Sequence, residues 1–120
     1  MKNSAPLSPK DWTLKAVQMD LARQIEPLDR VLEFFDLAQR CGYNAVVLYL
    51  EDRIRTESYP YAAPGEFYTP EEIRRMVDYA AGKGLELIPV VSNLGHTERF
   101  LAHPELAPLS ELRGEIAGRF

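Results

Sequence analysis

Apolar residues recur along the chain in a pattern that predicts three short strands. The clearest is the run from Ala45 to Leu50, which is apolar or aromatic throughout and typical of a parallel strand covered on both faces. Weaker patterns predict a first strand at residues 13–20 and a third at residues 85–91. Pro89 removes a backbone donor from the third strand, so we expect it at an edge or a bulge.

Two amphipathic helices are predicted between these strands. Pro27 suits the first turn of one helix, and Gly42 ends it. Thr69 and Glu72 form a capping box with Pro70 at the first helical position, which predicts where the second helix begins. Apolar residues recur at the i, i+3, i+4 spacing along both helices. We expect these helices to pack on the sheet through Leu32, Phe35, Ile73 and Val77.

The remaining segments are less regular. Residues 1–12 are expected to be a disordered lead-in. Residues 53–68 hold two prolines and three tyrosines, and we interpret them as a long loop. A short helical turn is predicted at residues 97–102, and one more helix at residues 109–120.

The alternation of strands and helices predicts an α/β fold. Short connections between successive strands and helices require parallel strands joined by right-handed crossovers. Three such βα units are present, whereas a closed (β/α)8 barrel needs roughly 250 residues. The chain is therefore expected to be either a small open sheet or a partial (β/α)8 TIM barrel formed by its first three βα units.

Composition narrows the classes of partner. The chain has 120 residues with 14 Lys and Arg against 18 Asp and Glu, and the resulting net charge of −4 argues against nucleic-acid binding. Its single cysteine, Cys41, cannot form an intramolecular disulfide, so a reducing compartment is the default expectation. No apolar run is long enough to span a bilayer, and residues 1–12 lack the apolar core of a signal peptide. We expect a cytoplasmic chain that does not bind membranes.

Polar residues follow each predicted strand, and parallel strands would bring them to one rim. They are Asp20 with Arg23, Glu51 with Asp52, and Asn93 with His96. Acids, a guanidinium and an imidazole that converge at a rim suit a polar substrate site. Simpler interpretations stay open: a structural ion pair between Asp20 and Arg23, solvated loop acids, and an ordinary surface or core histidine.

Four segments carry a resemblance to a known family. They are DLAR (20–23), NAVVLYLED (44–52), YTPEEIRRMVDYAAGKGLELIP (68–89) and LGHTERFLAHPEL (94–106). In this order the segments resemble glycoside hydrolase family 20, the β-N-acetylhexosaminidases, and in particular its hexosaminidase D-like branch. The resemblance implies that residues 13–120 are the N-terminal part of a catalytic (β/α)8 barrel.

The resemblance also implies roles for individual residues. Arg23 matches the family's arginine that grips hydroxyls of the terminal N-acetylhexosamine, and Asp20 and Glu51 are expected to bind substrate beside it. Asp52 and His96 match a supporting pair near the acid/base residue. We expect their side chains within hydrogen-bond reach, directly or through one water, so that the carboxylate orients the imidazole.

The chain also departs from the family pattern. Leu94 replaces the proline of a Pro-Gly-His motif, Tyr49 stands where many members have histidine, and Arg53 begins the segment that replaces an Asp-Gln-Gly-Trp continuation. The family's adjacent Asp-Glu pair, which positions the substrate's acetamido group and supplies the acid/base, is absent from these 120 residues. The resemblance thus implies part of a retaining exo-β-N-acetylhexosaminidase without catalytic residues of its own, acting on N-acetylhexosamine-containing glycosides without a cofactor.

Two alternatives remain open at this point. The first is a non-catalytic sugar-binding or self-associating remnant that pairs its open sheet edges with another copy. The second is a metal-dependent barrel enzyme with Asp20, Glu51, Asp52 and His96 as oxygen and nitrogen ligands.

Overall fold

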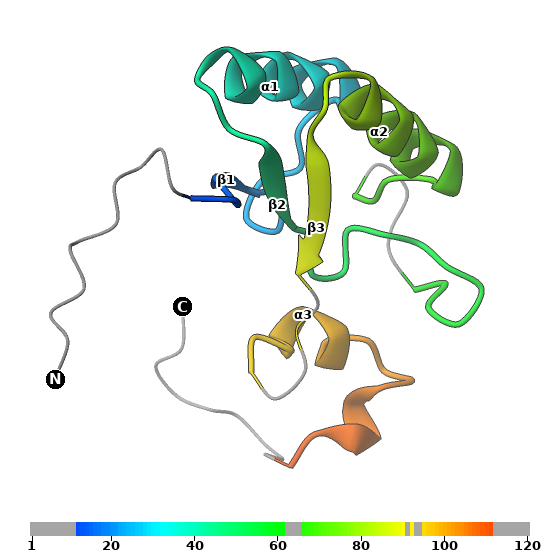
Figure 1. The fold of residues 1–120 in the computed structure, drawn as a ribbon. Coiled ribbons are helices and arrows are strands. Elements are labelled where there is room, and N and C mark those ends of the chain that lie inside the picture. Colours follow the sequence, from blue (N-terminus) through cyan, green and yellow to red (C-terminus); the bar gives the residue numbers. More distant parts are fainter. Residues whose placement is uncertain (1–11, 62–65, 91, 93–94, 112–120) are drawn as a thin grey trace, which may run out of the picture.

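The computed structural model describes residues 12–61, 66–90, 92 and 95–111, and three strands form its sheet. These are β1 (Ala16–Asp20), β2 (Ala45–Tyr49) and β3 (Glu86–Val90), hydrogen-bonded in the order β1-β2-β3 (Figure 1). Both pairs are parallel. This confirms the predicted α/β fold, and the observed strands lie within the predicted ranges.

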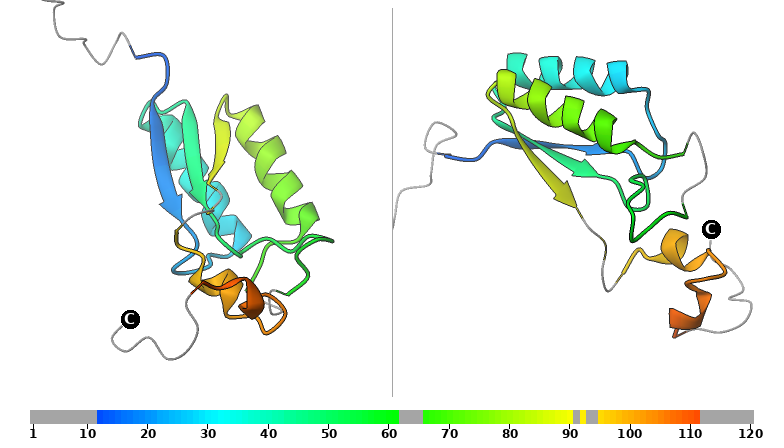
Figure 2. Two further views of the ribbon diagram at one scale, coloured as in Figure 1. Left: turned by 90° about the horizontal axis from the view of Figure 1, so that it is seen from below. Right: turned by 90° about the vertical axis from the view of Figure 1, so that its right-hand side faces the viewer.

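Helices α1 (Leu28–Arg40) and α2 (Pro70–Gly82) cover one face of the sheet (Figure 2). The predicted capping box is present, since the backbone N–H of Glu72 donates to the Thr69 hydroxyl at 3.2 Å and that of Thr69 donates to the Glu72 carboxylate at 2.9 Å. Gly42 adopts a φ of +82° just beyond α1, a backbone conformation that residues other than glycine rarely adopt. Both predicted helix boundaries are confirmed.

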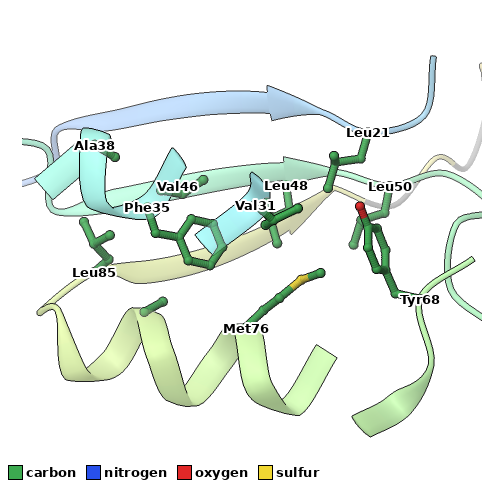
Figure 3. Packing of buried hydrophobic residues seen from close by; sticks show 11 residues of the cluster. Leu21, Val31, Phe35, Ala38, Val46, Leu48, Leu50, Tyr68, Met76 and Leu85 are labelled. Atoms are coloured by element: carbon green, nitrogen blue, oxygen red, sulfur yellow. The ribbon is translucent and has the colours of Figure 1, made fainter. Parts of the chain in front are cut away.

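The core lies between these helices and the sheet (Figure 3). It is made of apolar side chains that are at least nine-tenths buried together with one tyrosine: Leu21, Val31, Phe35, Ala38, Val46, Leu48, Leu50, Tyr68, Met76, Ala80 and Leu85. Because side chains alternate across a strand, the neighbouring register row of Gln18, Val47 and Ile88 belongs to the opposite face. No described helix covers that face (Figure 2).

The prediction that Val77 packs on the sheet is wrong. Leu32, Phe35 and Ile73 pack in or against the core as expected, but the side chain of Val77 is 48% exposed. The buried stripe of α2 is Met76 and Ala80, which are one turn apart and both fully buried. Val77 lies about 100° further round the helix than Met76, which carries it onto the solvent side.

The structure confirms the short helical turn and describes little of the chain termini. Helix α3 (Glu98–Leu101) lies within the predicted 97–102 turn, and a 3-10 turn, η2 (Ala107–Leu109), follows it. The predicted lead-in, apart from Trp12, and most of the predicted helix at 109–120 lie outside the described residues. Within the described ranges, no helix is both long and apolar enough to cross a membrane.

Candidate functional site

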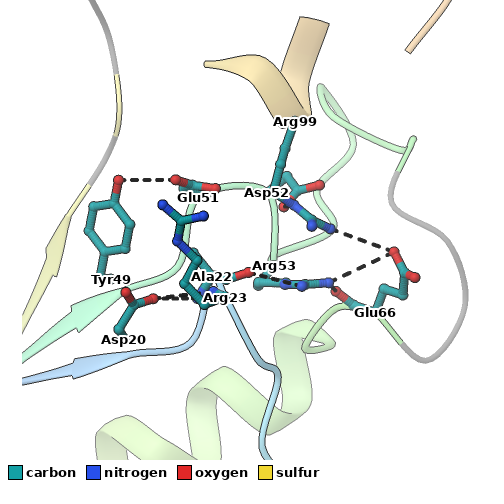
Figure 4. Close-up of polar contacts among 9 residues, drawn as sticks. All are labelled: Asp20, Ala22, Arg23, Tyr49, Glu51, Asp52, Arg53, Glu66 and Arg99. Atoms are coloured by element: carbon teal, nitrogen blue, oxygen red, sulfur yellow. Dashed lines mark hydrogen bonds and ion pairs between the residues drawn. The ribbon is translucent and has the colours of Figure 1, made fainter. Parts of the chain in front are cut away.

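The carboxyl ends of β1 and β2 bring most of the predicted site residues to one rim (Figure 4). Asp20 ends β1 and is paired in register with Tyr49, which ends β2. Arg23 follows β1 by three residues, and Glu51 and Asp52 follow β2 by two and three residues. Of the residues predicted after β3, Asn93 lies outside the described residues.

Asp20 shapes the turn that leads to Arg23. Its Oδ1 accepts a hydrogen bond from the backbone N–H of Ala22 at 3.0 Å and from that of Arg23 at 3.3 Å. The Arg23 side chain is exposed and forms no ion pair within the described part of the chain. The guanidinium is therefore available to a ligand, and the alternative of a structural Asp20–Arg23 ion pair is not observed.

Glu51 occupies a strained turn position two residues after the end of β2. Its φ is +45°, in the left-handed region that costs a non-glycine residue about 1 kcal/mol. The hydroxyl of Tyr49 donates to its Oε1 at 3.0 Å. Tyr49, which departs from the family pattern, thus fixes one oxygen of an acid at the rim.

Asp52 pairs with Arg99 and not with His96. Asp52 is only 5% exposed, and the Nε of Arg99 donates to its Oδ1 at 2.5 Å, which raises the pKa of the Arg99 guanidinium. His96 is exposed and has a φ of +56°. The predicted direct hydrogen bond between Asp52 and His96 is absent from the described residues, because the turn at His96 exposes its imidazole while the longer arginine reaches the carboxylate. Contact through a bridging water stays a prediction.

Sequence reasoning missed a second buried charge. Arg53 is only 6% exposed, and its guanidinium donates to the backbone carbonyls of Ala22 at 2.9 Å and Glu66 at 3.2 Å. The Glu66 carboxylate lies 3.8 Å from Arg53 and 3.6 Å from Arg99. Asp52, Arg53, Glu66 and Arg99 thus form a charge network at the rim (Figure 4). These four charged residues do not recur at the spacing of a helix or a strand, so the sequence gives no indication that they pair.

An aromatic cluster joins the loop after β2 to the segment around α3. The ring of Tyr59 contacts those of Tyr61, Phe100 and His103 at centroid distances of 5.1 to 5.8 Å. Burial raises the pKa of the Tyr59 hydroxyl to about 12. The loop's high tyrosine content was the only sequence signal for this cluster.

The described residues hold no group of three or more His, Cys, Asp or Glu side chains that could bind a metal ion. Asp20, Glu51, Asp52 and His96 are therefore not gathered into such a group in this structure.

Three parallel βα units with a polar rim at their carboxyl ends define the class of protein as a partial (β/α)8 barrel of the kind that carries enzyme active sites. No protein-family model matches the chain. The chain is 30% identical to human hexosaminidase D, over 84% of this chain and 21% of that protein. It also resembles the solved chitobiase of Flavobacterium johnsoniae, with 31% identity, a TM-score of 0.71, and coverage of 79% of this chain and 16% of that one.

A third relative is a mutant Streptomyces plicatus β-hexosaminidase solved with its product GlcNAc. It is 30% identical with a TM-score of 0.70, over 77% of this chain and 21% of that one. By sequence and by fold, the chain belongs to the glycoside hydrolase family 20 β-N-acetylhexosaminidases and matches part of their catalytic barrel. It spans only about a fifth of the length of these relatives.

Proposed function

We propose that the chain is the sugar-binding portion of a retaining exo-β-N-acetylhexosaminidase that releases terminal N-acetylhexosamine residues by substrate-assisted catalysis. The observation that carries the proposal is the exposed guanidinium of Arg23, which forms no ion pair with any described residue and lies at the barrel rim with Asp20 and Glu51 (Figure 4). Its planar fork matches two neighbouring sugar hydroxyls, to which a single amine could not donate in the same fixed geometry.

The neighbouring acids complete a polar surface for the sugar. The free oxygen of Glu51 can accept a hydrogen bond from a sugar hydroxyl, while its other oxygen is held by Tyr49. Asp20 acts mainly through the backbone that carries Arg23. Asp52 has a supporting role, because its carboxylate already neutralises Arg99 and thereby fastens the α3 segment to the rim.

The reaction itself requires groups beyond these residues. Substrate-assisted hydrolysis needs one acid to orient the 2-acetamido group, which attacks the anomeric carbon, and another to protonate the leaving oxygen. In these 120 residues no Asp is directly followed by Glu, the order that the family's catalytic pair has, so we assign both roles to residues outside this sequence. The chain alone should then bind sugar weakly and show no turnover of a chromogenic N-acetylglucosaminide.

The test is an NMR titration of the isotope-labelled chain with GlcNAc. We expect shifts of the Arg23 side-chain and Glu51 backbone signals, and at least a fivefold loss of affinity in Arg23→Ala. Arg30→Ala is the matched control, since Arg30 is an exposed arginine on α1 that pairs with Glu33. Robust hydrolysis by the pure chain, or binding unaffected by Arg23→Ala, would contradict the proposal.

Self-association is a second candidate property. Strands β1 and β3 each have one neighbour in the described sheet, so each has one unpaired edge. Trp12 and Leu14, at the start of the chain segment that becomes β1, are 53% and 52% exposed. We expect the chain to elute from gel filtration as a species larger than a monomer, and a monomer at all concentrations would exclude this property.

A further inference from the structure

Arg53 contacts three separate segments of the rim. Its guanidinium binds the carbonyl of Ala22, in the loop after β1, and that of Glu66, before α2. Its own backbone N–H donates to Leu50 at 2.8 Å, and its carbonyl accepts from Tyr68 at 2.7 Å. A single residue therefore sets the spacing of the loops that follow β1 and β2.

Burying an arginine side chain carries a large desolvation cost in free energy. Desolvation of the guanidinium is offset only by well-made hydrogen bonds, and apolar residues of similar size often stabilise a core as well or better. The carboxylate of Glu66 is 3.8 Å away and 58% exposed, so it compensates the charge only in part. The distinctive feature of Arg53 is its forked geometry, which lets it bind two carbonyls of different loops at once.

The carbonyl that Arg53 binds belongs to the peptide group that joins Ala22 to Arg23. The oxygen of this peptide accepts from Arg53 at 2.9 Å, and its N–H donates to Asp20 at 3.3 Å. Opposite sides of one planar peptide unit are thus held by two different residues. With the plane fixed, the Arg23 Cα atom is held in place, so that only rotation about φ and the side-chain torsions remain to orient the guanidinium.

We infer that Arg53 is a positioning residue for sugar recognition. Together with Asp20 it clamps the Ala22–Arg23 peptide, so that the backbone of Arg23 is already ordered before its guanidinium binds the sugar hydroxyls. This inference rests on the proposed function, since it takes Arg23 as the group that binds the sugar. The clamp lowers the ordering cost of binding and makes no contact with the ligand. The lysine ammonium has three donors on one nitrogen but lacks the rigid planar fork that directs two nitrogens to carbonyls of different loops, so lysine should replace arginine poorly.

The experiment compares Arg53→Lys and Arg53→Met with Arg55→Met in the 120-residue chain. Arg55 is a nearby exposed arginine that lies over the Phe67 ring at 5.6 Å, so it controls for loss of charge and of side-chain packing in the same loop. Backbone 15N relaxation reports the order of the Arg23 amide, and GlcNAc titration reports affinity. Thermal melting identifies the folded variants, and Arg53→Lys carries the test if Arg53→Met does not fold.

In Arg53→Met we expect the order parameter of the Arg23 amide to fall from about 0.85 to below about 0.6. GlcNAc affinity should fall at least fivefold, with Arg53→Lys between this variant and the parent. Arg55→Met should stay within twofold of the parent. In the Arg23→Ala background, Arg53→Met should cause no further loss of affinity, because the clamp acts only through Arg23.

An unchanged Arg23 order parameter in folded Arg53→Lys or Arg53→Met would overturn the inference. Equal losses of affinity from Arg53→Met with and without Arg23 would overturn it as well, since they would indicate a general structural effect. Failure of the proposed function looks different: Arg23→Ala would then bind GlcNAc normally, while the Arg23 amide would still lose order in Arg53→Met.

Discussion

The helix-covered face of the sheet and the carboxyl rim are built on different principles. On the covered face, apolar side chains such as Phe35 and Met76 recur at helical spacing and need only be buried. At the rim, Asp52 and Arg99 are 47 residues apart and must meet in one geometry. The covered face therefore depends on residue type and period, whereas the rim depends on the reach of particular side chains between loops.

The largest expected effect is in the covered face. Met76→Ala should destabilise the chain by about 2–5 kcal/mol, because it opens a cavity at a fully buried position. Val77→Ala, the adjacent exposed position, should change stability by no more than about 0.5 kcal/mol. Urea unfolding followed by circular dichroism measures both. Equal losses would mean that α2 buries a different stripe from the one observed.

A smaller loss is expected when the rim network is broken. Arg99→Met leaves the buried Asp52 carboxylate without its donor, which should cost about 1–3 kcal/mol. Adding Asp52→Asn removes the uncompensated charge and should restore part of that loss. Asp52→Asn should also be measured in the parent chain. If it lowers the free energy of unfolding by the same amount in the parent and in Arg99→Met, the two residues are not coupled.

Tyr68 and Tyr59 provide a comparison between a satisfied and an unsatisfied hydroxyl. The Tyr68 hydroxyl donates to the Glu26 carbonyl at 2.6 Å, so Tyr68→Phe should cost about 1 kcal/mol. The buried hydroxyl of Tyr59 has no partner among the described residues, and Tyr59→Phe should cost nothing measurable. Thermal unfolding of the two variants distinguishes them, and a larger loss from Tyr59→Phe would refute this reading of the rim.

The same two tyrosines predict how stability depends on alkaline pH. Burial raises the pKa of each hydroxyl from 10.0 to about 12 in the folded state. Their contribution is fully present below pH 10 and is lost as the pH rises from 10 towards 12, because only the unfolded chain releases these protons easily. Absorbance of tyrosinate should accordingly show two late-titrating groups that coincide with unfolding.

The smallest effect is expected where α1 meets α2. Lys83 bonds to Asp36 at 2.7 Å and lowers the pKa of that carboxyl, assisted by the Tyr79 hydroxyl. The pair's contribution is present above the ordinary aspartate pKa of 3.8 and is lost as the pH falls through the lowered value. Lys83→Met should raise the pKa of Asp36, which an NMR pH titration measures, and should scarcely alter the melting temperature because both side chains are still one-third exposed to solvent.

Sequence pattern was sufficient for the fold because its signals are local. The capping box at Thr69 and the glycine after α1 each involve a few neighbouring residues, and both were located correctly. The stripe of α2 was misjudged at Val77, where two adjacent apolar residues compete for one buried position. Helical spacing alone does not decide which of them faces the sheet.

The site was predicted less fully. Asp20, Arg23, Glu51 and Asp52 lie at the rim because parallel strands impose that position. Their partners do not follow from strand order: Arg99 binds Asp52, and Arg53 binds the loop after β1. Long side chains that cross between loops leave no periodic trace in the sequence.

The uncovered face of the sheet should be visible in the thermodynamics of unfolding. The row of Gln18, Val47 and Ile88 has no described helix over it, so part of its surface is already hydrated in the isolated folded chain. Unfolding then exposes less new apolar area per residue than in a sheet covered on both sides. The heat capacity of unfolding should consequently fall below the usual figure of about 12–15 cal/mol/K per residue, and the denaturant dependence of stability should be correspondingly shallow.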